Sequence, residues 1–290
     1  AADLAIFERA WQIVNDRYWN PAYLARDWNE VYNEYLPLAQ EAADNEALYE
    51  IIEIMYTEIG DNHSVYLPPS RVEEAKEQFG TLRCLSYFGA AADPYSYAGA
   101  VRYTNFGTAG YVAVPDLMSD GITGAIKDAI AGVSEQGADA LILDLRGNPG
   151  GQLVTMMEVA GLFTSGLLWR VVMRWSLPTP YPALGFGTFT DLPLVILIDE
   201  HVHSAAEGLA GALQNSGRAT VIGTTTAGNV EAVLPFCLRD GSQAWIASGV
   251  LAPLLGPTWE GRGVSPDYYT PGPAALSYAL GWLRGAHDEH

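Results

Sequence analysis

The strongest candidate for a nucleophile in this sequence is Ser204, which lies between two predicted elements of the core. The continuous apolar run Leu194–Ile198 predicts a buried strand, and the residues after Ser204 have the spacing of a helix. An oxyanion formed beside this hydroxyl would accept the N–H of Ala205 at the start of that helix. Ser204 and Glu207 also match a capping box, so a purely capping role is the alternative.

A serine hydroxyl needs a base, which in proteins is usually histidine or lysine. The sequence has only two lysines, and both precede the serine. Of its five histidines, His287 and His290 lie in a polar tail. His201 and His203 directly precede the serine in an extended segment, whose neighbouring side chains point to alternate faces. We therefore favour His63 as the base, with a capping or surface histidine as the alternative.

A glycine-rich turn, Asp144–Gly151, follows the buried-strand run Ala140–Leu143 and precedes a helical pattern over Gln152–Phe163. Glycine allows the backbone to approach another group closely and to direct its N–H groups at that group. The dipole of the following helix adds positive potential at the same place. The turn is therefore suited to stabilising a negatively charged oxygen.

A carboxylate that could hold the histidine occurs late in the sequence. A histidine base works best when a carboxylate or amide fixes one imidazole tautomer. Glu260 is the candidate, because it lies among glycines and beside Trp259. A glutamate in a solvated loop, or an ion pair with Arg262, is the alternative.

The elements that must position these residues fall into two parts. Apolar residues recur at helical spacing in three N-terminal stretches; the first ends at Pro21, the second starts with a predicted cap at Asp27, and the third ends at Gly60. After Pro68 and Pro69, strands alternate with helices, which predicts an α/β core behind a helical cap. The predicted strands are Leu82–Phe88, Gly99–Tyr103, Gly110–Val114, Ala140–Leu143, Leu168–Arg174, Leu194–Ile198, Thr220–Ile222, Val230–Leu238 and Ser242–Ala247, and the predicted helices are Gly121–Gln136, Gln152–Phe163, one after Ser204, and Ala274–Arg284.

The composition restricts the class of protein. The 290 residues are 49% hydrophobic, which is sufficient for a large core, and carry a net charge of -19. Such an acidic chain is a poor ligand for nucleic acid or an anionic membrane. No apolar run reaches the roughly 20 residues of a membrane-spanning helix. We expect no metal and no cofactor, because no group of ligand residues has the spacing of a metal site.

Two features of the sequence bear on cysteine pairing and on the compartment. Cys84 and Cys237 allow one disulfide, but we favour two inert core thiols. No signal peptide is visible at the N-terminus, and we favour a periplasmic or secreted location if an export signal has been removed. The oligomeric state is left open.

Together these segments resemble the C-terminal processing and tricorn-type serine peptidases, the tail-specific proteases. The resemblance rests on Gly60–Ser64, Asp144–Gly151, Ser204–Glu207 and Glu260–Asp267, which occur in the order found in that family. It implies a serine-type endopeptidase that acts on peptide or protein substrates without a cofactor, and a crotonase-like fold of ββα units. We accordingly expect an N-terminal helical domain over residues 1–70 and a crotonase-like α/β catalytic domain over residues 71–290.

The resemblance also implies the role of each residue near the nucleophile. Ser204 corresponds to the nucleophile. We assign the oxyanion-hole donors to the N–H groups of Ala205 and Gly150, with Gly151 as the second choice in the turn. The processing-protease branch uses a lysine as base, but Asn229 occupies that position here, so a Ser-Lys dyad in that form is excluded.

The tricorn-like branch uses a histidine and a carboxylate instead, which correspond to His63 and Glu260. A residue beside the histidine contributes a hydroxyl in that branch, and Ser64 or Asn62 would take this role here. Many relatives carry a PDZ module, for which the span Pro68–Asn105 is too short. Two other functions are open: an inactive peptidase-like module that binds a hydrophobic ligand or peptide, as retinoid-binding relatives of the fold do, and an esterase or amidase acting on small molecules.

Overall fold

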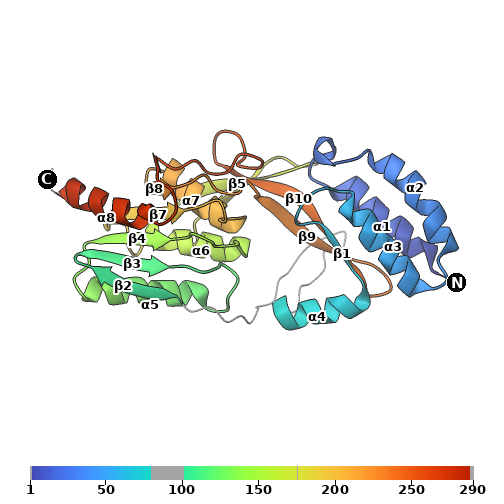
Figure 1. The fold of residues 1–290 in the computed structure, drawn as a ribbon, viewed down its shortest axis with the longest axis horizontal. Coiled ribbons are helices and arrows are strands. Elements are labelled where there is room, and N and C mark those ends of the chain that lie inside the picture. Colours follow the sequence, from blue (N-terminus) through green and yellow to red (C-terminus); the bar gives the residue numbers. More distant parts are fainter. Residues whose placement is uncertain (1, 80–100, 175, 288–290) are drawn as a thin grey trace. The chain divides into compact units, whose positions relative to one another are not determined.

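The computed structural model of the chain describes residues 2–79, 101–174 and 176–287 (Figure 1). It has the mixed α/β architecture that the sequence predicts. The chain divides into two compact units, each built from several segments. The first unit comprises Ala1–Ser96, Val172–Leu177 and Glu231–Val250, and the second comprises Tyr97–Val171, Pro178–Val230 and Leu251–His290.

The first unit begins with three helices, α1 (Leu4–Arg17), α2 (Trp28–Glu41) and α3 (Asn45–Thr57). An aspartate side chain caps each of them, and the predicted cap Asp27 accepts the backbone N–H groups of Asn29 and Glu30. Their apolar stripes meet in one core, because residues at helical spacing face the same side. A short helical turn, Pro21–Tyr23, separates α1 from α2.

The first unit also contains strands that come from distant parts of the sequence. Strand β1 (Val65–Leu67) pairs antiparallel with β10 (Gln243–Pro253), and β9 (Glu231–Cys237) pairs with β10 on its other edge. Helix α4 (Pro69–Phe79) follows β1 in the sequence and contacts it. Residues of β10 such as Ile246 complete the core formed by the three helices. The His63 loop is thereby fixed between α3 and β1.

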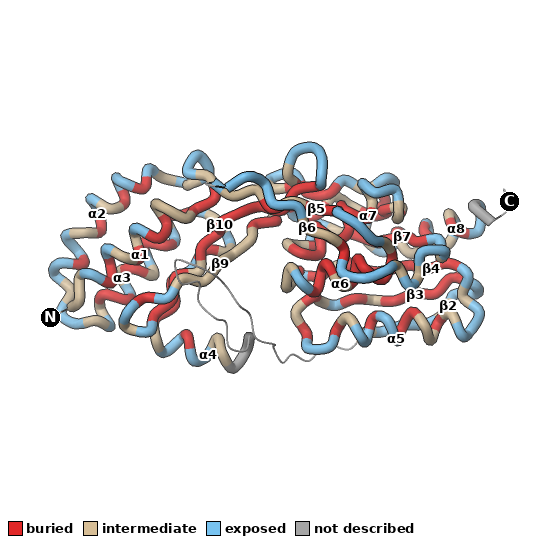
Figure 2. Tube along the Cα trace, turned by 180° about the vertical axis from the view of Figure 1, so that it is seen from behind, coloured by how far each residue is buried: buried red, intermediate tan, exposed pale blue. Residues whose placement is uncertain are grey.

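The second unit is built on a six-stranded sheet in the order β11-β8-β7-β4-β3-β2. The strands from β3 to β11 are mutually parallel, and β2 pairs antiparallel with β3. Every residue of β4 and β7 is buried, which explains their continuous apolar runs (Figure 2). The strands are β2 (Arg102–Phe106), β3 (Ala109–Ala113), β4 (Ala140–Asp144), β7 (Leu194–Ile198), β8 (Thr220–Gly223) and β11 (Tyr268–Tyr269).

Helices cover this sheet. One face packs against α8 (Ala274–His287), whose Ala275, Ala279 and Leu283 contact residues such as Ile142 and Val195. Neighbouring helices α5 (Ile122–Glu135), α6 (Leu153–Phe163) and α7 (Ala205–Asn215) complete the unit. Two further strands, β5 (Leu167–Met173) and β6 (Thr179–Pro182), pair antiparallel and join the sheet of β10 in the order β1-β10-β5-β6.

Most predicted elements are confirmed to within a few residues, and the differences have local causes. Strand β10 runs beyond the predicted end at Ala247 because a bulge between Ala247 and Gly249 lets the pairing with β9 continue. The short elements β1, β6, β11 and α4 were not predicted. The predicted strand Leu82–Phe88, and the start of Gly99–Tyr103, lie outside the described residues.

The predicted helical domain, residues 1–70, falls within the first unit, but its boundary and the crotonase-like assignment stay predictions. The preference for two core thiols is wrong for Cys237, which is disulfide-bonded and lies at the exposed end of β9 rather than in the core. Cys84 lies outside the described residues. Among the helices that the structure describes, none has both the length and the apolar character to cross a membrane.

Candidate active site

Ser204 adopts a backbone conformation that serine rarely takes. Its φ is 54°, and it is the only residue other than glycine with a positive φ in the described part of the chain. It lies at the N-terminus of α7, a few residues after β7 ends. A strained turn between strand and helix is how several hydrolases expose a nucleophilic serine. The predicted position of Ser204 between strand and helix is therefore confirmed.

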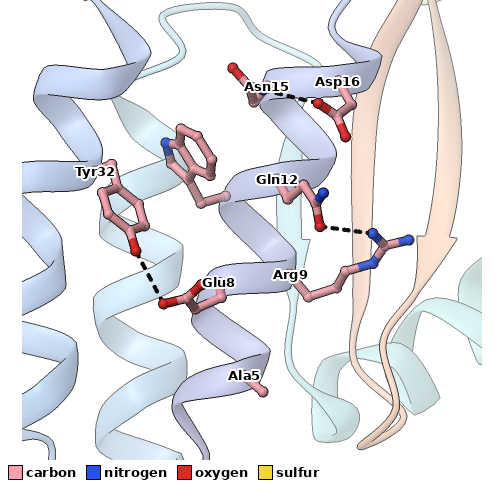
Figure 3. Close-up of a pocket in the computed structure, with 8 residues that line it drawn as sticks. Ala5, Glu8, Arg9, Gln12, Asn15, Asp16 and Tyr32 are labelled. Carbon is pink, nitrogen blue, oxygen red and sulfur yellow. Dashed lines mark hydrogen bonds between the residues drawn. The ribbon is translucent and has the colours of Figure 1, made fainter.

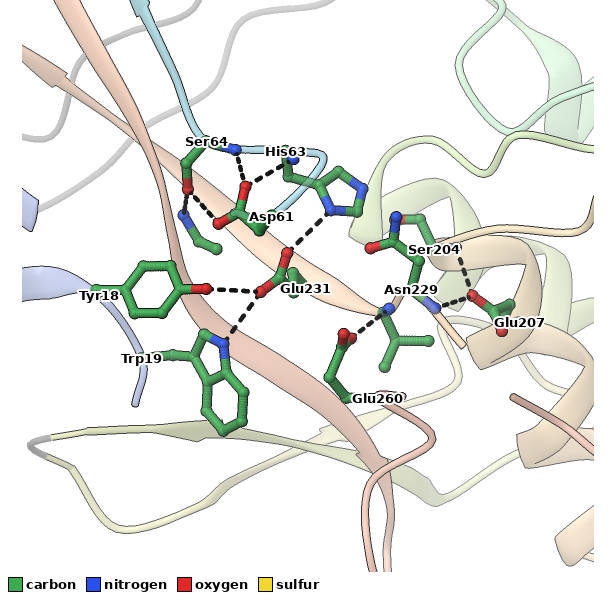
Figure 4. A network of polar contacts seen from close by, with 12 residues as sticks. Tyr18, Trp19, Asp61, His63, Ser64, Ser204, Glu207, Asn229, Glu231 and Glu260 are labelled. Atoms are coloured by element: carbon green, nitrogen blue, oxygen red, sulfur yellow. Dashed lines mark hydrogen bonds and ion pairs between the residues drawn. The ribbon is translucent and has the colours of Figure 1, made fainter. Parts of the chain in front are cut away.

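The elbow around Ser204 is held by a buried carboxylate. Glu207 is fully buried, and its Oε1 accepts the N–H of Ser204 at 3.1 Å and the N–H of Asn229 at 2.8 Å (Figure 4). Its Oε2 accepts the N–H of Gly228 at 2.6 Å and the hydroxyl of Thr226. The predicted capping box is thus present, and its carboxylate half is the bond from the N–H of Ser204 to the Glu207 side chain.

The glycine-rich turn lies directly against this elbow. A Cβ added at Gly150 would lie 2.8 Å from Ser204 Cβ and 3.0 Å from Ala205 N, so only glycine fits there. The buried Asn148 joins the two segments, because its carbonyl oxygen accepts the N–H of His203 at 3.0 Å. The sequence-distant turn and elbow therefore form one structure, as the family resemblance implied.

The N–H groups of the turn are not equivalent. The N–H of Gly150, our first choice as oxyanion donor, already donates to Asn148 Oδ1 at 2.8 Å. Within the described part of the second unit, the N–H groups of Gly151 and Ala205 have no acceptor. The N–H of Gly151 is therefore the one that the turn leaves without an acceptor there, because the Asn148 side chain accepts that of Gly150. Which of the two glycines donates to an oxyanion stays a prediction.

The loop that carries His63 is fixed by Asp61. Asp61 Oδ1 accepts the N–H of His63 at 2.9 Å and that of Ser64 at 2.6 Å. The Ser64 hydroxyl donates to Asp61 Oδ2 at 2.7 Å and accepts the N–H of Ala247 at 3.0 Å. Ser64 thus supports the loop and ties it to β10, and its hydroxyl is used in doing so. The imidazole keeps 23% of its surface exposed.

A carboxylate that the sequence analysis did not predict lies next to the imidazole of His63. Glu231, the first residue of β9, places Oε2 3.2 Å from His63 Nδ1. Its Oε1 accepts the indole N–H of Trp19 at 3.1 Å and the hydroxyl of Tyr18 at 3.4 Å (Figure 4). Only 4% of the Glu231 side chain is exposed. A glutamate that begins an otherwise apolar strand was the one signal in the sequence.

Glu260 lies in the second unit and has a different contact. Its Oε2 accepts the N–H of Val230 at 2.8 Å, in the residue that precedes Glu231. Asn229, which precedes Val230 in the sequence, contacts the elbow through its backbone. Its carbonyl oxygen accepts the N–H of Ser204 at 2.8 Å. His63 with Glu231 belongs to one unit, and Ser204 with Glu260 belongs to the other. The convergence of His63 with Ser204 and Glu260 stays a prediction.

The charged residues of the Asp144–Gly151 turn form a structural pair. The Arg146 guanidinium binds the Asp144 carboxylate through Nε and Nη2, and Nη1 donates to the carbonyl oxygen of Gly272 at 3.0 Å. The Tyr111 hydroxyl donates to Asp144 Oδ2 at 2.6 Å. Burial and this hydrogen bond raise the pKa of Tyr111 to about 12. These groups anchor the end of β4 to its neighbours.

A separate hollow lies on the surface of α1 (Figure 3). Its polar groups bind one another: the Tyr32 hydroxyl donates to Glu8 at 3.1 Å, and the Arg9 guanidinium donates to Gln12 at 3.1 Å. Asn15 and Asp16 pair in the same way. Because these side chains satisfy each other, the hollow has the character of an ordinary solvated helix surface.

Two family models match the chain. The model of peptidase family S41 matches residues 108–270, which include the glycine-rich turn and the Ser204 elbow. The model of the tricorn protease C1 domain matches residues 4–57, the three N-terminal helices. The matched regions thus fall in both compact units.

Individual proteins agree with these models. The chain is 34% identical over 172 residues to a carboxyl-terminal-processing protease of Picosynechococcus, a match that covers 59% of this chain and 41% of that protein. It therefore spans less than half the length of this curated relative. Two solved structures share its fold: a photosystem II D1 C-terminal processing protease, with a TM-score of 0.72, 20% identity and 92% coverage of both chains, and a lipoprotein from Streptococcus agalactiae, with a TM-score of 0.73, 17% identity and coverage of 97% and 96%.

Proposed function

Because the chain belongs to peptidase family S41, we propose that it is a serine-type endopeptidase that cleaves peptide or protein substrates through an acyl-enzyme. The observation that carries this proposal is the elbow at Ser204. A strained serine, with φ of 54°, adjoins two N–H groups that lack acceptors in the described part of its unit. Strain of this kind costs about 1–3 kcal/mol and persists where function requires it.

The proposed reaction uses Ser204 as nucleophile and His63 as base. His63 Nε2 removes the hydroxyl proton while Oγ attacks the substrate carbonyl carbon. The N–H groups of Ala205 and Gly151 stabilise the oxyanion, and His63 then gives the proton to the leaving amine. Water, activated by the same imidazole, hydrolyses the ester and regenerates Ser204.

The magnitudes are sufficient for catalysis. An oxyanion-hole donor contributes about 3 kcal/mol to transition-state stabilisation. General base assistance contributes about 10²–10⁴-fold in rate. Neither needs a metal or cofactor. The reaction requires His63 of the first unit to reach Ser204 of the second. The chain passes from one unit to the other between Val230 and Glu231. Glu231 contacts the His63 imidazole, and the carbonyl oxygen of Asn229 accepts the N–H of Ser204.

Glu260 keeps its predicted role as the orienting carboxylate in this proposal. Its contact with the N–H of Val230 attaches it to the residue next to Asn229, whose N–H binds Glu207 at the elbow. One of its oxygens is used in that contact. Glu260→Gln would preserve the shape while removing the charge, and therefore measures how much the charge contributes.

A fluorophosphonate probe tests the proposal, because it reacts with activated serines. We expect the intact chain to be labelled at Ser204, Ser204→Ala to be unlabelled and to have no peptidase activity, and His63→Ala to be labelled at least about 10²-fold more slowly. Circular dichroism checks that both variants are folded. Full activity in folded Ser204→Ala would refute the mechanism. A folded chain that binds peptides but is never labelled would favour the inactive binding module.

A further inference from the structure

The imidazole of His63 must present a lone pair to Ser204 if it is to act as base, and this requires the proton on Nδ1. A carboxylate only accepts hydrogen bonds, so a carboxylate at Nδ1 selects this tautomer. We propose that Glu231, and not only Glu260, is the positioning residue that holds His63 in this form. This inference rests on the proposed function for its consequence in catalysis, but the tautomer itself can be measured independently.

The division of contacts over the Glu231 carboxylate supports this assignment. One oxygen, Oε1, receives the indole N–H of Trp19 and the hydroxyl of Tyr18 at 3.1 and 3.4 Å. The other, Oε2, lies 3.2 Å from His63 Nδ1. A carboxylate with only 4% exposure is costly unless donors surround it. The two aromatic donors meet part of that cost and leave Oε2 directed at the imidazole.

The donors on Oε1 retain their protons. Burial, together with the nearby carboxylates of Glu231 and Asp61, raises the pKa of Tyr18 well above its ordinary value. The indole N–H of Trp19 cannot ionise in the physiological range and can only donate. Glu231 is therefore held by two permanent donors, and it remains the acceptor in its contact with Nδ1.

Hydrogen bonds attach Trp19 and the His63 loop to the same residue of β10, Ala247. The carbonyl oxygen of Ala247 accepts the backbone N–H of Trp19 at 2.9 Å, and its N–H donates to the Ser64 hydroxyl at 3.0 Å. Glu231 itself pairs with Val250 of the same strand. The His63 loop, Trp19 and Glu231 are thus all attached to β10, so their spacing does not depend on side-chain flexibility alone.

Glu260 has a different described contact, because its Oε2 accepts the N–H of Val230 at 2.8 Å. The two glutamates therefore differ in what they are expected to control. Glu231 sets the tautomer of His63 within the first unit. Glu260, whose orienting role belongs to the proposed function, also binds the segment that leads into Glu231.

Nitrogen-15 NMR of the imidazole rings in the full chain tests the assignment directly. The His63 signals are identified by their loss in His63→Ala. Above the pH at which the ring loses its charge, we expect wild-type His63 to carry its proton on Nδ1. Glu231→Gln, whose amide can also donate to Nδ1, is expected to shift a measurable fraction to the Nε2–H form. Glu260→Gln is the comparison variant and is expected to change the tautomer less than Glu231→Gln does, because the described contact at Nδ1 is that of Glu231.

Either of two results would overturn the proposal: wild-type His63 with its proton on Nε2, or a tautomer that Glu260→Gln changes and Glu231→Gln does not. The wild-type measurement decides even if Glu231→Gln fails to fold. It does not depend on turnover, so failure of the proposed peptidase function, detected by activity in Ser204→Ala, is distinguishable from failure of this assignment.

A kinetic cycle separates positioning from a merely structural role. We expect Glu231→Gln to lower kcat by about 10²–10⁴-fold with little change in KM, because a misplaced proton affects the transition state and not substrate binding. The same substitution made in His63→Ala is expected to slow probe labelling by less than about twofold, since residues that act as a unit are not additive. If Glu231→Gln slows probe labelling by the same factor in the wild-type and the His63→Ala backgrounds, the positioning role is contradicted.

Discussion

The carboxylate of Glu207 accepts the backbone N–H of Ser204 while itself being fully buried. The same side chain receives N–H groups from Gly228 and Asn229, and a hydroxyl from Thr226. It therefore connects the first turn of α7 to the loop after β8. The conformation of the candidate nucleophile depends on a residue that need not touch a substrate.

We predict that Glu207→Ala lowers the free energy of unfolding by at least about 3 kcal/mol, because several buried donors lose a charged acceptor worth roughly 1.5–3 kcal/mol each. Urea denaturation followed by circular dichroism measures this. Glu135→Ala, at an exposed position on α5, is the control and is expected to change stability by less than about 0.5 kcal/mol. Equal effects at both positions would show that the Glu207 network contributes nothing.

The strain at Ser204 gives a second prediction. Glycine adopts a φ of 54° without the steric cost that alanine retains. We expect Ser204→Gly to be as stable as Ser204→Ala, or more stable by about 1 kcal/mol, with both variants inactive. At Ser134, inside α5, the order is expected to reverse, and glycine is less stable than alanine by about 0.5–1 kcal/mol. Thermal unfolding of the four variants compares the two sites, and the same order at both would argue against strain.

The parts of the fold that were predictable are those with strong local signals. Strand β7 matches its predicted range Leu194–Ile198, because a short apolar run between Pro193 and Asp199 is typical of a strand buried on both faces. The helices α5 and α6 were predicted because apolar residues recur at helical spacing in them and glycines lie just before each one. In contrast, β11 has only two residues and forms because Asp267 joins the loop before it to β8, which no local pattern records.

The candidate site was predictable where its residues follow a strand or turn, as Ser204 and Gly151 do. Glu231 was missed because its contacts with Tyr18 and Trp19 span 213 and 212 residues. Only the folded first unit brings them together. The choice between Gly150 and Gly151 had the same difficulty, since it depends on where the Asn148 side chain points.

The turn supplies a third prediction through its glycines. Gly150 and Gly147 both have positive φ, 93° and 74°, but a Cβ at Gly150 would meet the Ser204 elbow whereas a Cβ at Gly147 meets nothing within 4 Å. We expect Gly150→Ala to reduce probe labelling of Ser204 by at least about 10²-fold, because it displaces the elbow from the oxyanion donors. Gly147→Ala carries only the cost of its backbone, about 1 kcal/mol, and is expected to label normally. Normal labelling of Gly150→Ala would show that the close packing of turn and elbow is not required.

Alkaline pH tests the anchoring of β4 by Tyr111. Burial and the hydrogen bond to Asp144 raise the pKa of Tyr111 from 10.0 to about 12, so the folded chain keeps a proton that the unfolded chain releases. The unfolded state then binds fewer protons, and the stability that Tyr111 contributes is present below pH 10 and is lost as the pH rises toward 12.

Tyr111→Phe removes both the hydrogen bond and this titration. We therefore expect the variant to be less stable than the wild type at pH 8 by about 1 kcal/mol, the usual contribution of such a bond. Because the wild type alone loses the contribution of Tyr111 above pH 10, the difference is expected to shrink as the pH approaches 12. Guanidinium denaturation at a series of pH values measures the difference between the two chains. A difference that stays constant over this range would mean that the Tyr111 hydroxyl and the Asp144 carboxylate are not coupled in the folded state.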